Sequence, residues 1–312
     1  MDITVVSLNP SIDWQWTTPS FVYGGLNRAK SGQHYASGKG INVCAALRNL
    51  GMAPLCMGFN FRENGSIITD ALDEWGVQHD FVTVEGAVRV NIKLHDATTN
   101  TMTELNQAGA FVHSNALALF WEKIGVATTG SGPILVLSGS MPTGVPADTY
   151  RQLCIAWPGM VILDADGEAL KLALTADSPP FCIKPNLFEL ESCFGVTLST
   201  KEAVAAFCRG LIADYGVKMI CVSMGADGAM LVTETAAYYT PALSLNVRGV
   251  QGAGDAMVAG LVYGLTHKYS PSELLRIAAA AAAASVVRDG TLMCTKEGFH
   301  KYLARIPVPL VV

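Results

Sequence analysis

Residues 41–59 read INVCAALRNLGMAPLCMGF and contain a predicted helix, its end and the strand that follows. From Ile41 to Leu50 the apolar residues recur at helical spacing, and Gly51 ends the pattern. Leu55 to Phe59 is then a short apolar run, which is typical of a strand buried on both faces. The stretch therefore predicts one helix-to-strand unit of an α/β domain.

The same alternation of strands and helices extends in both directions from this unit. Further strands are predicted at residues 3–8, 134–138, 161–164, 181–184 and 219–223, and further helices at residues 67–75, 253–265 and 272–287. Continuous apolar strands that alternate with helices indicate a mostly parallel central sheet flanked by helices. No repeat or obvious linker interrupts the pattern, and the length of 312 residues suits one large domain or two modest ones.

Two segments break the alternation, at about residues 12–36 and 87–107. They mix apolar and polar residues, as in Val90-Asn91-Ile92-Lys93-Leu94, which is typical of a strand with one face in water. Lids commonly come from insertions at the ligand end of a domain. We expect the two segments to form a small β-sheet lid.

The composition excludes several classes of protein. Half of the residues are hydrophobic and 15% are charged, against a typical charged share of about 25%, so the chain can bury a large core. The net charge is −5 and there is no long basic run, which argues against a nucleic-acid partner but leaves room for a phosphate ligand. The eight cysteines are scattered without a C-x-x-C pair, which indicates free buried thiols rather than disulfides or a zinc site.

No segment is typical of a signal peptide or a membrane span. Asp2 stands where a signal peptide needs positive charge, and the apolar run after it is too short. Residues 277–287 are mostly alanine and number 11, about half of what a bilayer requires, so we expect a buried helix that packs closely through its small side chains. We expect a cytoplasmic protein with no membrane partner.

The strongest local signal is Gly252-Ala253-Gly254-Asp255, which opens a predicted helix. Two glycines let the backbone turn, and free amides at a helix start favour an anion such as a transferring phosphoryl group. Asp255 would lie beside that anion, where a carboxylate can take a proton from an attacking hydroxyl. An acid in this position can also merely stabilise the helix N-terminus, so both interpretations remain open on these residues alone.

A second glycine-rich turn, Ser37-Gly38-Lys39-Gly40-Ile41-Asn42, also precedes a helix. It is not a Walker A loop, because Gly40 follows Lys39 where Ser or Thr is required, and it does not contain a dinucleotide fingerprint. Lys39 could meet a phosphate and Asn42 could bond sugar hydroxyls. The alternative is an ordinary strand-to-helix turn with a solvated lysine.

A third feature is Lys184-Pro185-Asn186-Leu187-Phe188-Glu189. Asn186 and Glu189 are three residues apart, so they share one face of a predicted helix. An amide and a carboxylate suit a hydrated Mg²⁺, which keeps most of its waters. The alternative is a capping arrangement in which both side chains bond backbone amides.

Smaller polar features follow several predicted strands. Asp13 comes just beyond the first strand, residues 138–140 end another with Ser-Gly-Ser, and Ser223 opens the turn that contains Gly225 and Gly228 after a third. Open α/β sheets bind ligands at the carboxyl ends of their strands. Each feature alone, like Arg89 in the lid segment, is more often a surface turn or a solvated charge, whereas their repetition favours a shared site.

Taken in order, these segments resemble the PfkB family of the ribokinase-like fold, and most closely its phosphosugar branch. That branch contains 1-phosphofructokinases, the minor type of 6-phosphofructokinase and tagatose-6-phosphate kinases. Each motif is weak alone, whereas eight motifs in the family's order over nearly the whole chain are highly specific. They are residues 9–13 (NPSID), 38–43 (GKGINV), 103–106 (TELN), 138–142 (SGSMP), 167–170 (GEAL), 184–190 (KPNLFEL), 252–255 (GAGD) and 290–294 (GTLMC).

The resemblance implies a single ribokinase-like domain over residues 1–312, a three-layer sandwich with a β lid through which members often form homodimers. It also implies ATP-dependent phosphorylation of a hydroxyl of a ketohexose phosphate, with Mg²⁺. By motif position Asp255 is then the catalytic base, and the amides of Gly252, Ala253 and Gly254 form the anion hole.

The resemblance also implies the binding residues. The sugar phosphate would be held by Asp13, Gly38, Lys39, Asn42, Arg89 and Ser138. The ATP site would be lined by Lys184, Ser223, Gly225 and Gly228. Mg²⁺ would be organised through water by Asn186 and Glu189.

The chain departs from the family pattern at Ser37, Asp166, Gln251 and the bulky Trp14-Gln15-Trp16, which leaves the exact sugar open. Residues 91–93 (NIK) and 103–106 (TELN) resemble the 1-phosphofructokinase subgroup and favour fructose 1-phosphate. Two alternatives remain. One is a kinase of an unphosphorylated sugar or nucleoside, which would give Arg89 little use. The other is a non-catalytic sugar-phosphate binding protein.

Overall fold

The stretch at residues 41–59 folds as predicted, into helix α1 (Lys39–Asn49) and strand β4 (Pro54–Phe61). Gly51 between them has a φ of 86°, a left-handed conformation that glycine adopts without steric cost. The structure, a computed structural model, describes residues 2–128, 134–290 and 292–312.

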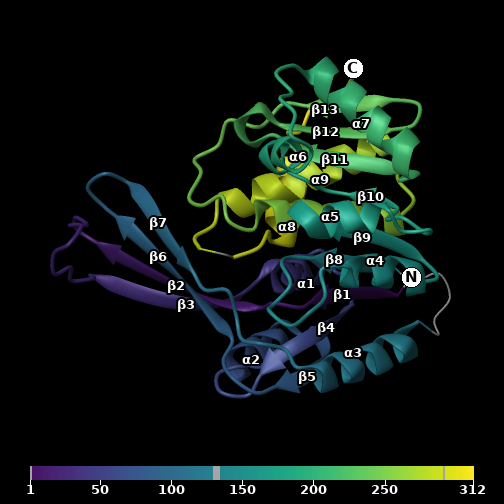
Figure 1. Cartoon of the computed structure of the whole chain (residues 1–312). Coiled ribbons are helices and arrows are strands. Elements are labelled where there is room, and N and C mark those ends of the chain that lie inside the picture. Colours follow the sequence, from purple (N-terminus) through teal and green to yellow (C-terminus); the bar gives the residue numbers. More distant parts are fainter. Residues whose placement is uncertain (1, 129–133, 291) are drawn as a thin grey trace.

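The main sheet has ten strands in the order β14-β13-β12-β11-β10-β9-β8-β1-β4-β5 (Figure 1). Neighbours from β5 to β11 are parallel, and the three strands beyond β11 are antiparallel. The predicted mostly parallel sheet is therefore confirmed. The strands not yet given are β1 (Ile3–Ser7), β5 (Gln78–Val84), β8 (Ile134–Ser138), β9 (Met160–Asp164), β10 (Cys182–Ile183), β11 (Met219–Ser223), β12 (Ala229–Thr233), β13 (Ala237–Thr240) and β14 (Leu310–Val311).

The order of the strands places helices on both faces of this sheet. The chain runs from β1 outward to β4 and β5, then returns to β8 beside β1 and continues the other way. Because crossovers between parallel strands are right-handed, this reversal puts α1 and α2 on one face and α3 to α7 on the other. Helix α8 packs against α1, α9 packs against α8, and α10 packs against α9. The helices not yet given are α2 (Ser66–Trp75), α3 (Ser114–Ala127), α4 (Thr149–Ala156), α5 (Gly167–Leu174), α6 (Leu187–Phe194), α7 (Lys201–Tyr215), α8 (Ala253–Thr266), α9 (Pro271–Val286) and α10 (Lys296–Leu303).

A separate four-stranded sheet, here called the lid, projects from the main body (Figure 1). Its order is β3-β2-β6-β7, with β2 and β6 parallel and the outer pairs antiparallel. The two segments that break the sequence alternation thus pair with each other. Asp13 lies in lid strand β2, just beyond β1 and within the predicted lid segment. The strands are β2 (Ser11–Thr18), β3 (Ser31–Ser37), β6 (Arg89–Asp96) and β7 (Thr101–Asn106).

The alanine-rich helix α9 packs closely against α8, as its small side chains predict. A Cβ built at Gly260 of α8 would lie 2.8 Å from the Cα of Ala278, so only glycine permits this approach. Within the described residues no helix is long and apolar enough to cross a bilayer. All eight cysteines are buried and free, which confirms the prediction of unpaired thiols.

Some elements were not predicted. The strands β5 and β12 to β14 and helix α10 lie outside the predicted elements, and the strand expected at residues 181–184 is only the two-residue β10. Thr291 of the 290–294 motif lies outside the described residues.

Candidate active site

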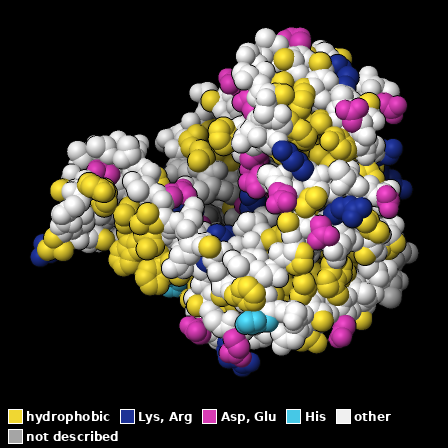
Figure 2. All heavy atoms as spheres, in the orientation of Figure 1, with side chains coloured by type: hydrophobic (Ala, Val, Ile, Leu, Met, Phe, Trp, Pro, Cys, Tyr) yellow, Lys and Arg dark blue, Asp and Glu magenta, His cyan; other side chains and the backbone are white. Residues whose placement is uncertain are grey.

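The lid and the carboxyl ends of the parallel strands enclose a cleft of about 1340 Å³. Figure 2 shows the molecule hollowed between the lid and the body. The cleft is lined by every residue that the sequence assigned to catalysis, to ATP or to Mg²⁺, and by the candidate sugar residues other than Ser138. Residues 13, 39 and 255, which are far apart in the sequence, therefore share one cavity.

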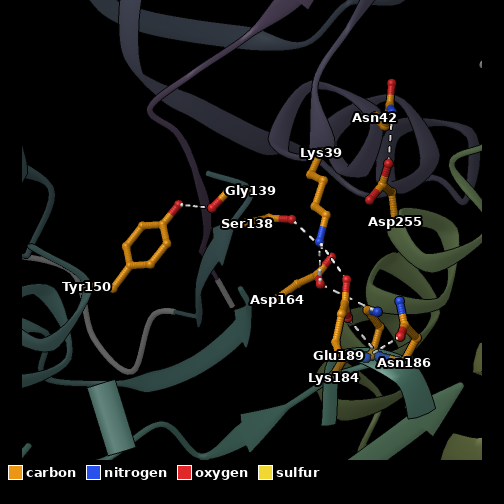
Figure 3. A network of polar contacts seen from close by, with 10 residues as sticks. All are labelled: Lys39, Asn42, Ser138, Gly139, Tyr150, Asp164, Lys184, Asn186, Glu189 and Asp255. Atoms are coloured by element: carbon orange, nitrogen blue, oxygen red, sulfur yellow. Dashed lines mark hydrogen bonds and ion pairs between the residues drawn. The ribbon is translucent and has the colours of Figure 1, made fainter. Parts of the chain in front are cut away.

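The start of α8 places Asp255 in this cleft. Gly252 precedes the helix with a φ of 75°, and a Cβ there would lie 2.3 Å from the methyl carbon of Met293. The left-handed backbone conformation favours glycine here, and any larger residue would also displace the end of the Met293 side chain. Asp255 follows in the first turn with 6% of its surface exposed, and its Oδ2 accepts a hydrogen bond of 2.8 Å from Nδ2 of Asn42 (Figure 3).

The surroundings of Asp255 raise the pKa of its carboxyl group toward neutral pH. Burial, with a further contribution from the negative charge of Asp164, raises the pKa of Asp255 to about 6. The hydrogen bond from Asn42 and the nearby ammonium groups oppose this rise. A carboxyl group with this pKa is mostly ionised at pH 7 and is more basic than an exposed aspartate, as a general base requires.

Asp164, at the end of β9, is the centre of a charged network (Figure 3). Its Oδ1 lies 3.1 Å from Nζ of Lys39 and 3.4 Å from Nζ of Lys184. Burial alone would raise the pKa of Asp164, but the two ammonium groups hold it below its usual value. Lys39 is therefore paired, and the interpretation of it as a solvated lysine is wrong.

Sequence reasoning missed Asp164 as a site residue. The available signal was an acid that ends the apolar run Val161-Ile162-Leu163, at the carboxyl end of a parallel strand. Its partner Lys184 also faces the start of α8, because a Cβ added at Gly254 would lie 3.3 Å from the Lys184 ammonium. Positive charge is thus held next to the turn formed by residues 252–254.

Asn186 and Glu189 form the capping box of helix α6. The Oδ1 of Asn186 accepts the backbone N–H of Glu189 at 2.7 Å, and Oε2 of Glu189 accepts the backbone N–H of Asn186 at 2.8 Å. Both side chains therefore cap α6, and this capping uses one oxygen of each. The other oxygen of Glu189, Oε1, lies 3.7 Å from Nζ of Lys39 and lines the cleft.

The lid provides polar groups on the side of the cleft that faces the body. Asp13 is buried and ion-paired with Lys93 at 2.7 Å, and Asn91 donates to it at 2.9 Å. Lys93 and Asn91 were not among the predicted site residues. The signal in the sequence was the period of two in β6, which puts residues 89, 91 and 93 on one face of the strand.

Arg89 is a cation without an acidic partner. Its guanidinium donates to the backbone oxygen of Asn9 at 3.2 Å and to that of Gln107 at 3.4 Å. No carboxylate in the described part of the chain lies within 4.0 Å of it. Burial lowers the pKa of Arg89, and the charge of Asp13 partly offsets this effect. The guanidinium nevertheless remains protonated, because its usual pKa is far above neutral.

Ser138 lies beside the main cleft rather than in it. It lines an adjoining cavity of about 130 Å³, together with Lys39, Arg89 and Ser140. Its hydroxyl donates to Oδ2 of Asp164 at 3.3 Å. The small cavity and the cleft thus share two cations.

The far end of the cleft is apolar. Ser223, Gly225 and Gly228 lie where β11 ends, and a Cβ at Gly228 would lie 2.1 Å from the backbone oxygen of Thr240, so this turn too requires glycine. Much of the lining of the cleft outside the lid is small or aliphatic, and includes Leu243, Leu245, Ala279, Ala282, Ala283 and Val286, with the polar side chains of Thr240 and Ser244 among them. A flat aromatic ring with a polar edge suits such a pocket.

Comparison with known proteins agrees with this geometry. The family model of the pfkB family carbohydrate kinases matches residues 2–297. A 1-phosphofructokinase from Bacillus subtilis is 33% identical over 309 residues, which cover 98% of this chain and 99% of the relative. The chain is also similar to the phosphofructokinase-2 of Escherichia coli, solved in complex with substrates and products, with a TM-score of 0.92 and 26% identity over 98% of this chain and 99% of the other. A ribokinase from Thermotoga maritima shares the fold, with a TM-score of 0.77 and 20% identity over 97% of this chain and 99% of the other.

The chain therefore belongs to the PfkB family of carbohydrate kinases. It is a sugar kinase, a phosphotransferase with an alcohol group as acceptor, on a ribokinase-like fold.

Proposed function

We propose that this kinase transfers the γ-phosphoryl group of ATP to a hydroxyl of a ketohexose phosphate, with fructose 1-phosphate as the preferred substrate. The observation that carries the proposal is the unpaired Arg89 at the lid end of the cleft that contains Asp255. A half-buried guanidinium without a carboxylate is costly unless a ligand supplies the negative charge. An existing phosphate on the substrate supplies it, and an unphosphorylated sugar does not.

The sugar phosphate lies between the lid and the ends of the strands, in the part of the cleft lined by Asp13, Gly38, Lys39, Asn42 and Arg89. Arg89 and Lys39 line both the cleft and the small cavity beside Ser138. The existing phosphate of the substrate would lie between these two cations, where the cleft meets the small cavity. The similarity to relatives named 1-phosphofructokinase supports a phosphosugar substrate.

ATP occupies the other part of the cleft. The apolar side chains of α9 and of the loop after β13 suit the purine, and Lys184 lies where the phosphates would approach α8. The attacking hydroxyl oxygen bonds to the γ-phosphorus while the bond from that phosphorus to the β–γ bridging oxygen breaks, which releases ADP. Asp255 takes the proton of the hydroxyl, and Asn42 fixes the carboxylate through its hydrogen bond.

The backbone amides of Gly252, Ala253 and Gly254 stabilise the negative charge that develops on the γ-phosphoryl group. The left-handed turn at Gly252 and the helix start would place these amides at the phosphoryl group. The amide of Ala253 donates to the backbone oxygen of Val250 at 3.3 Å, so it would exchange this weak hydrogen bond for one to the phosphoryl group. Lys184 adds a positive charge on the same side.

The donor set fits a hydrated Mg²⁺ that arrives with the nucleotide. Within the described residues there is no cluster of three metal-ligating side chains, and Asp164 is already neutralised by two lysines. Glu189 has one oxygen toward the cleft and Asn186 stands beside it, so these residues would hold the ion through water. The bound ion would neutralise charge on the phosphates.

A substrate panel tests the proposal. ATP consumption is measured with fructose 1-phosphate, fructose 6-phosphate, tagatose 6-phosphate and fructose. We expect the highest kcat/KM with fructose 1-phosphate. The highest kcat/KM with fructose would favour the unphosphorylated-sugar kinase, and no consumption with any sugar phosphate would favour a binding protein.

The outward face of the lid supports a homodimer. Trp14, Ile92 and Leu105 are direct neighbours across β2, β6 and β7, and Trp14 and Leu105 are 41% and 58% exposed. Figure 2 shows hydrophobic side chains gathered over the lid. A second copy of the chain would cover this apolar face by placing its own lid against it.

A further inference from the structure

We infer that Gln251 is a positioning residue that connects the lid to the turn at residues 252–254 through a hydrogen bond to Glu104. Nε2 of Gln251 donates to Oε1 of Glu104 at 2.9 Å, and both residues line the cleft. Glu104 belongs to lid strand β7, whereas Gln251 directly precedes Gly252. Gln251 is one of the positions at which this chain departs from the family pattern, so the resemblance does not imply this contact. The inference rests on the proposed function, because it concerns how a sugar under the lid affects the turn that receives the phosphoryl group.

Glu104 is available for this contact because its neighbour within the lid already has a partner. Lys93 lies directly opposite Glu104 in the pairing of β6 with β7, and its ammonium group is ion-paired with Asp13 at 2.7 Å. In the part of the chain that the structure describes, no lysine, arginine or histidine nitrogen lies within 4.0 Å of the Glu104 carboxylate. A single exposed hydrogen bond contributes little net stability, so this contact can break and re-form as the lid moves.

Two loops of the body support the Gln251 side chain. The guanidinium of Arg248 is paired with Asp289 at 2.9 Å, which joins the loop before α8 to the loop after α9. A Cβ added at Gly249 would lie 3.1 Å from Oε1 of Gln251 and 3.5 Å from the backbone oxygen of Gly290. The Gln251 side chain therefore lies over Gly249, where the two loops meet.

The opposite edge of the lid contacts the same pair of loops. Tyr35 lies in β3, which is the edge strand at the other side of the lid from β7. A Cβ added at Gly290 would lie 2.9 Å from the ring carbon Cε2 of Tyr35, so the ring packs directly against this glycine. Burial, with a further contribution from the negative charge of Asp289, raises the pKa of Tyr35, which agrees with this packing. Both edges of the lid thus contact one unit of the body, and Gln251 is the part of that unit next to Gly252.

This arrangement predicts that the two substrates bind cooperatively. A sugar bound under the lid favours the closed lid, in which the hydrogen bond to Glu104 holds Gln251 and therefore the start of the turn in place. The amides of residues 252–254 are then held where the γ-phosphoryl group of ATP arrives, so the sugar should tighten the binding of the nucleotide. By linkage, the nucleotide should tighten the binding of the sugar by the same factor.

Binding measurements on four variants test the inference. Gln251→Met removes the donor, Glu104→Met removes the acceptor, the double variant removes both, and Glu104→Gln removes the charge but keeps an acceptor oxygen. For each we would measure by calorimetry the dissociation constant of a non-hydrolysable ATP analogue with Mg²⁺, with and without saturating sugar. The sugar is fructose 1-phosphate, or fructose if the substrate panel prefers it.

The matched control is Gln152→Met, which breaks an exposed hydrogen bond of the same kind outside the cleft. There Nε2 of Gln152 donates to Oδ2 of Asp148 at 2.9 Å, at the start of α4. The melting temperature of every variant would be recorded as well, because a merely structural hydrogen bond changes stability without changing the coupling between the two ligands.

We expect the sugar to tighten the analogue about 5- to 10-fold in the wild type. In Gln251→Met this factor should fall below about twofold, because one hydrogen bond changes an equilibrium constant by roughly this amount. Glu104→Met and the double variant should show the same reduced factor, since the two residues act through one contact. Glu104→Gln should keep most of the coupling, and Gln152→Met should keep all of it.

Three results would overturn the inference. They are a wild type in which the sugar does not tighten the analogue, a Gln251→Met variant that keeps the wild-type factor at any melting temperature, and a double variant in which the two single losses add. Failure of the proposed function looks different. The wild type would then prefer fructose in the substrate panel, and the coupling between lid and turn would be measured with fructose.

Discussion

The main sheet and the lid supply different kinds of functional group. Strands β1, β8 and β9 are buried almost throughout, and their chemistry lies where they end, as with Asp164. Every residue of lid strand β7 is exposed, and β6 alternates, so its functional side chains stand along the strand face. In the proposed function the body provides the groups of phosphoryl transfer, and the lid provides groups that bind the sugar. Variants of the body should lower kcat, and variants of the inner lid face should raise the KM for the sugar.

The largest effect is expected in the body, at Asp255. Asp255→Asn keeps the hydrogen-bonding shape but cannot accept the proton, so kcat should fall about 10²- to 10⁴-fold. The dissociation constant of the sugar phosphate, measured by calorimetry, should change little. The control Glu202→Gln alters an acid in the first turn of α7, outside the cleft, and should keep full activity. Near-normal kcat in Asp255→Asn would remove Asp255 from the role of base.

The dependence of kcat/KM on pH provides a second test of Asp255 as the general base. A base must be ionised, and the pKa of Asp255 is raised to about 6, so kcat/KM should fall about tenfold per pH unit as the pH drops below that value. Asp164→Asn removes a negative charge that raises the pKa of Asp255, so it should move this acid limb to lower pH. An unmoved limb would assign the titration to the substrate phosphate, whose second pKa is also about 6.

In the lid, Arg89→Met should affect binding rather than chemistry. The loss of a charged hydrogen bond to phosphate should raise the KM for the sugar phosphate about 10- to 100-fold and leave the KM for ATP unchanged. Arg62→Met removes a surface arginine paired with Glu85 and serves as the control. Equal losses for fructose and fructose 1-phosphate in Arg89→Met would argue against a phosphate contact.

The smallest effect on chemistry is expected on the outer lid face. Leu105→Glu places a charge in the apolar row with Ile92 and Trp14, so the proposed dimer should dissociate at least about tenfold more readily. Sedimentation at several protein concentrations measures this change. Thr101→Glu, at the exposed end of the same strand, is the control. A monomeric wild type would rule out the lid-mediated dimer.

The sequence predicted the body better than the lid and the site. Buried parallel strands are continuous apolar runs, and glycine marks where helices end, so β1, β4 and α1 were located closely. Lys93 was missed because a lysine in an alternating strand is normally solvated, and the register that sets it beside Asp13 is a tertiary property. Asp164 was missed because its two lysine partners come from distant segments. The capping box could not be distinguished from a metal site, since both use the same two residues.

Because all eight cysteines are buried, their reaction with a thiol reagent would report local unfolding of the chain. Burial raises the pKa of several of these thiols, that of Cys221 to about 12, so they are protonated and unreactive in the folded chain. An alkylating reagent would modify them at the rate at which their surroundings unfold. Cys182, Cys208 and Cys221 lie in β10, α7 and β11, on the side of the sheet where ATP is proposed to bind, whereas Cys44 and Cys56 lie in α1 and β4. Mass spectrometry of labelled peptides would therefore show which half of the sheet each substrate protects.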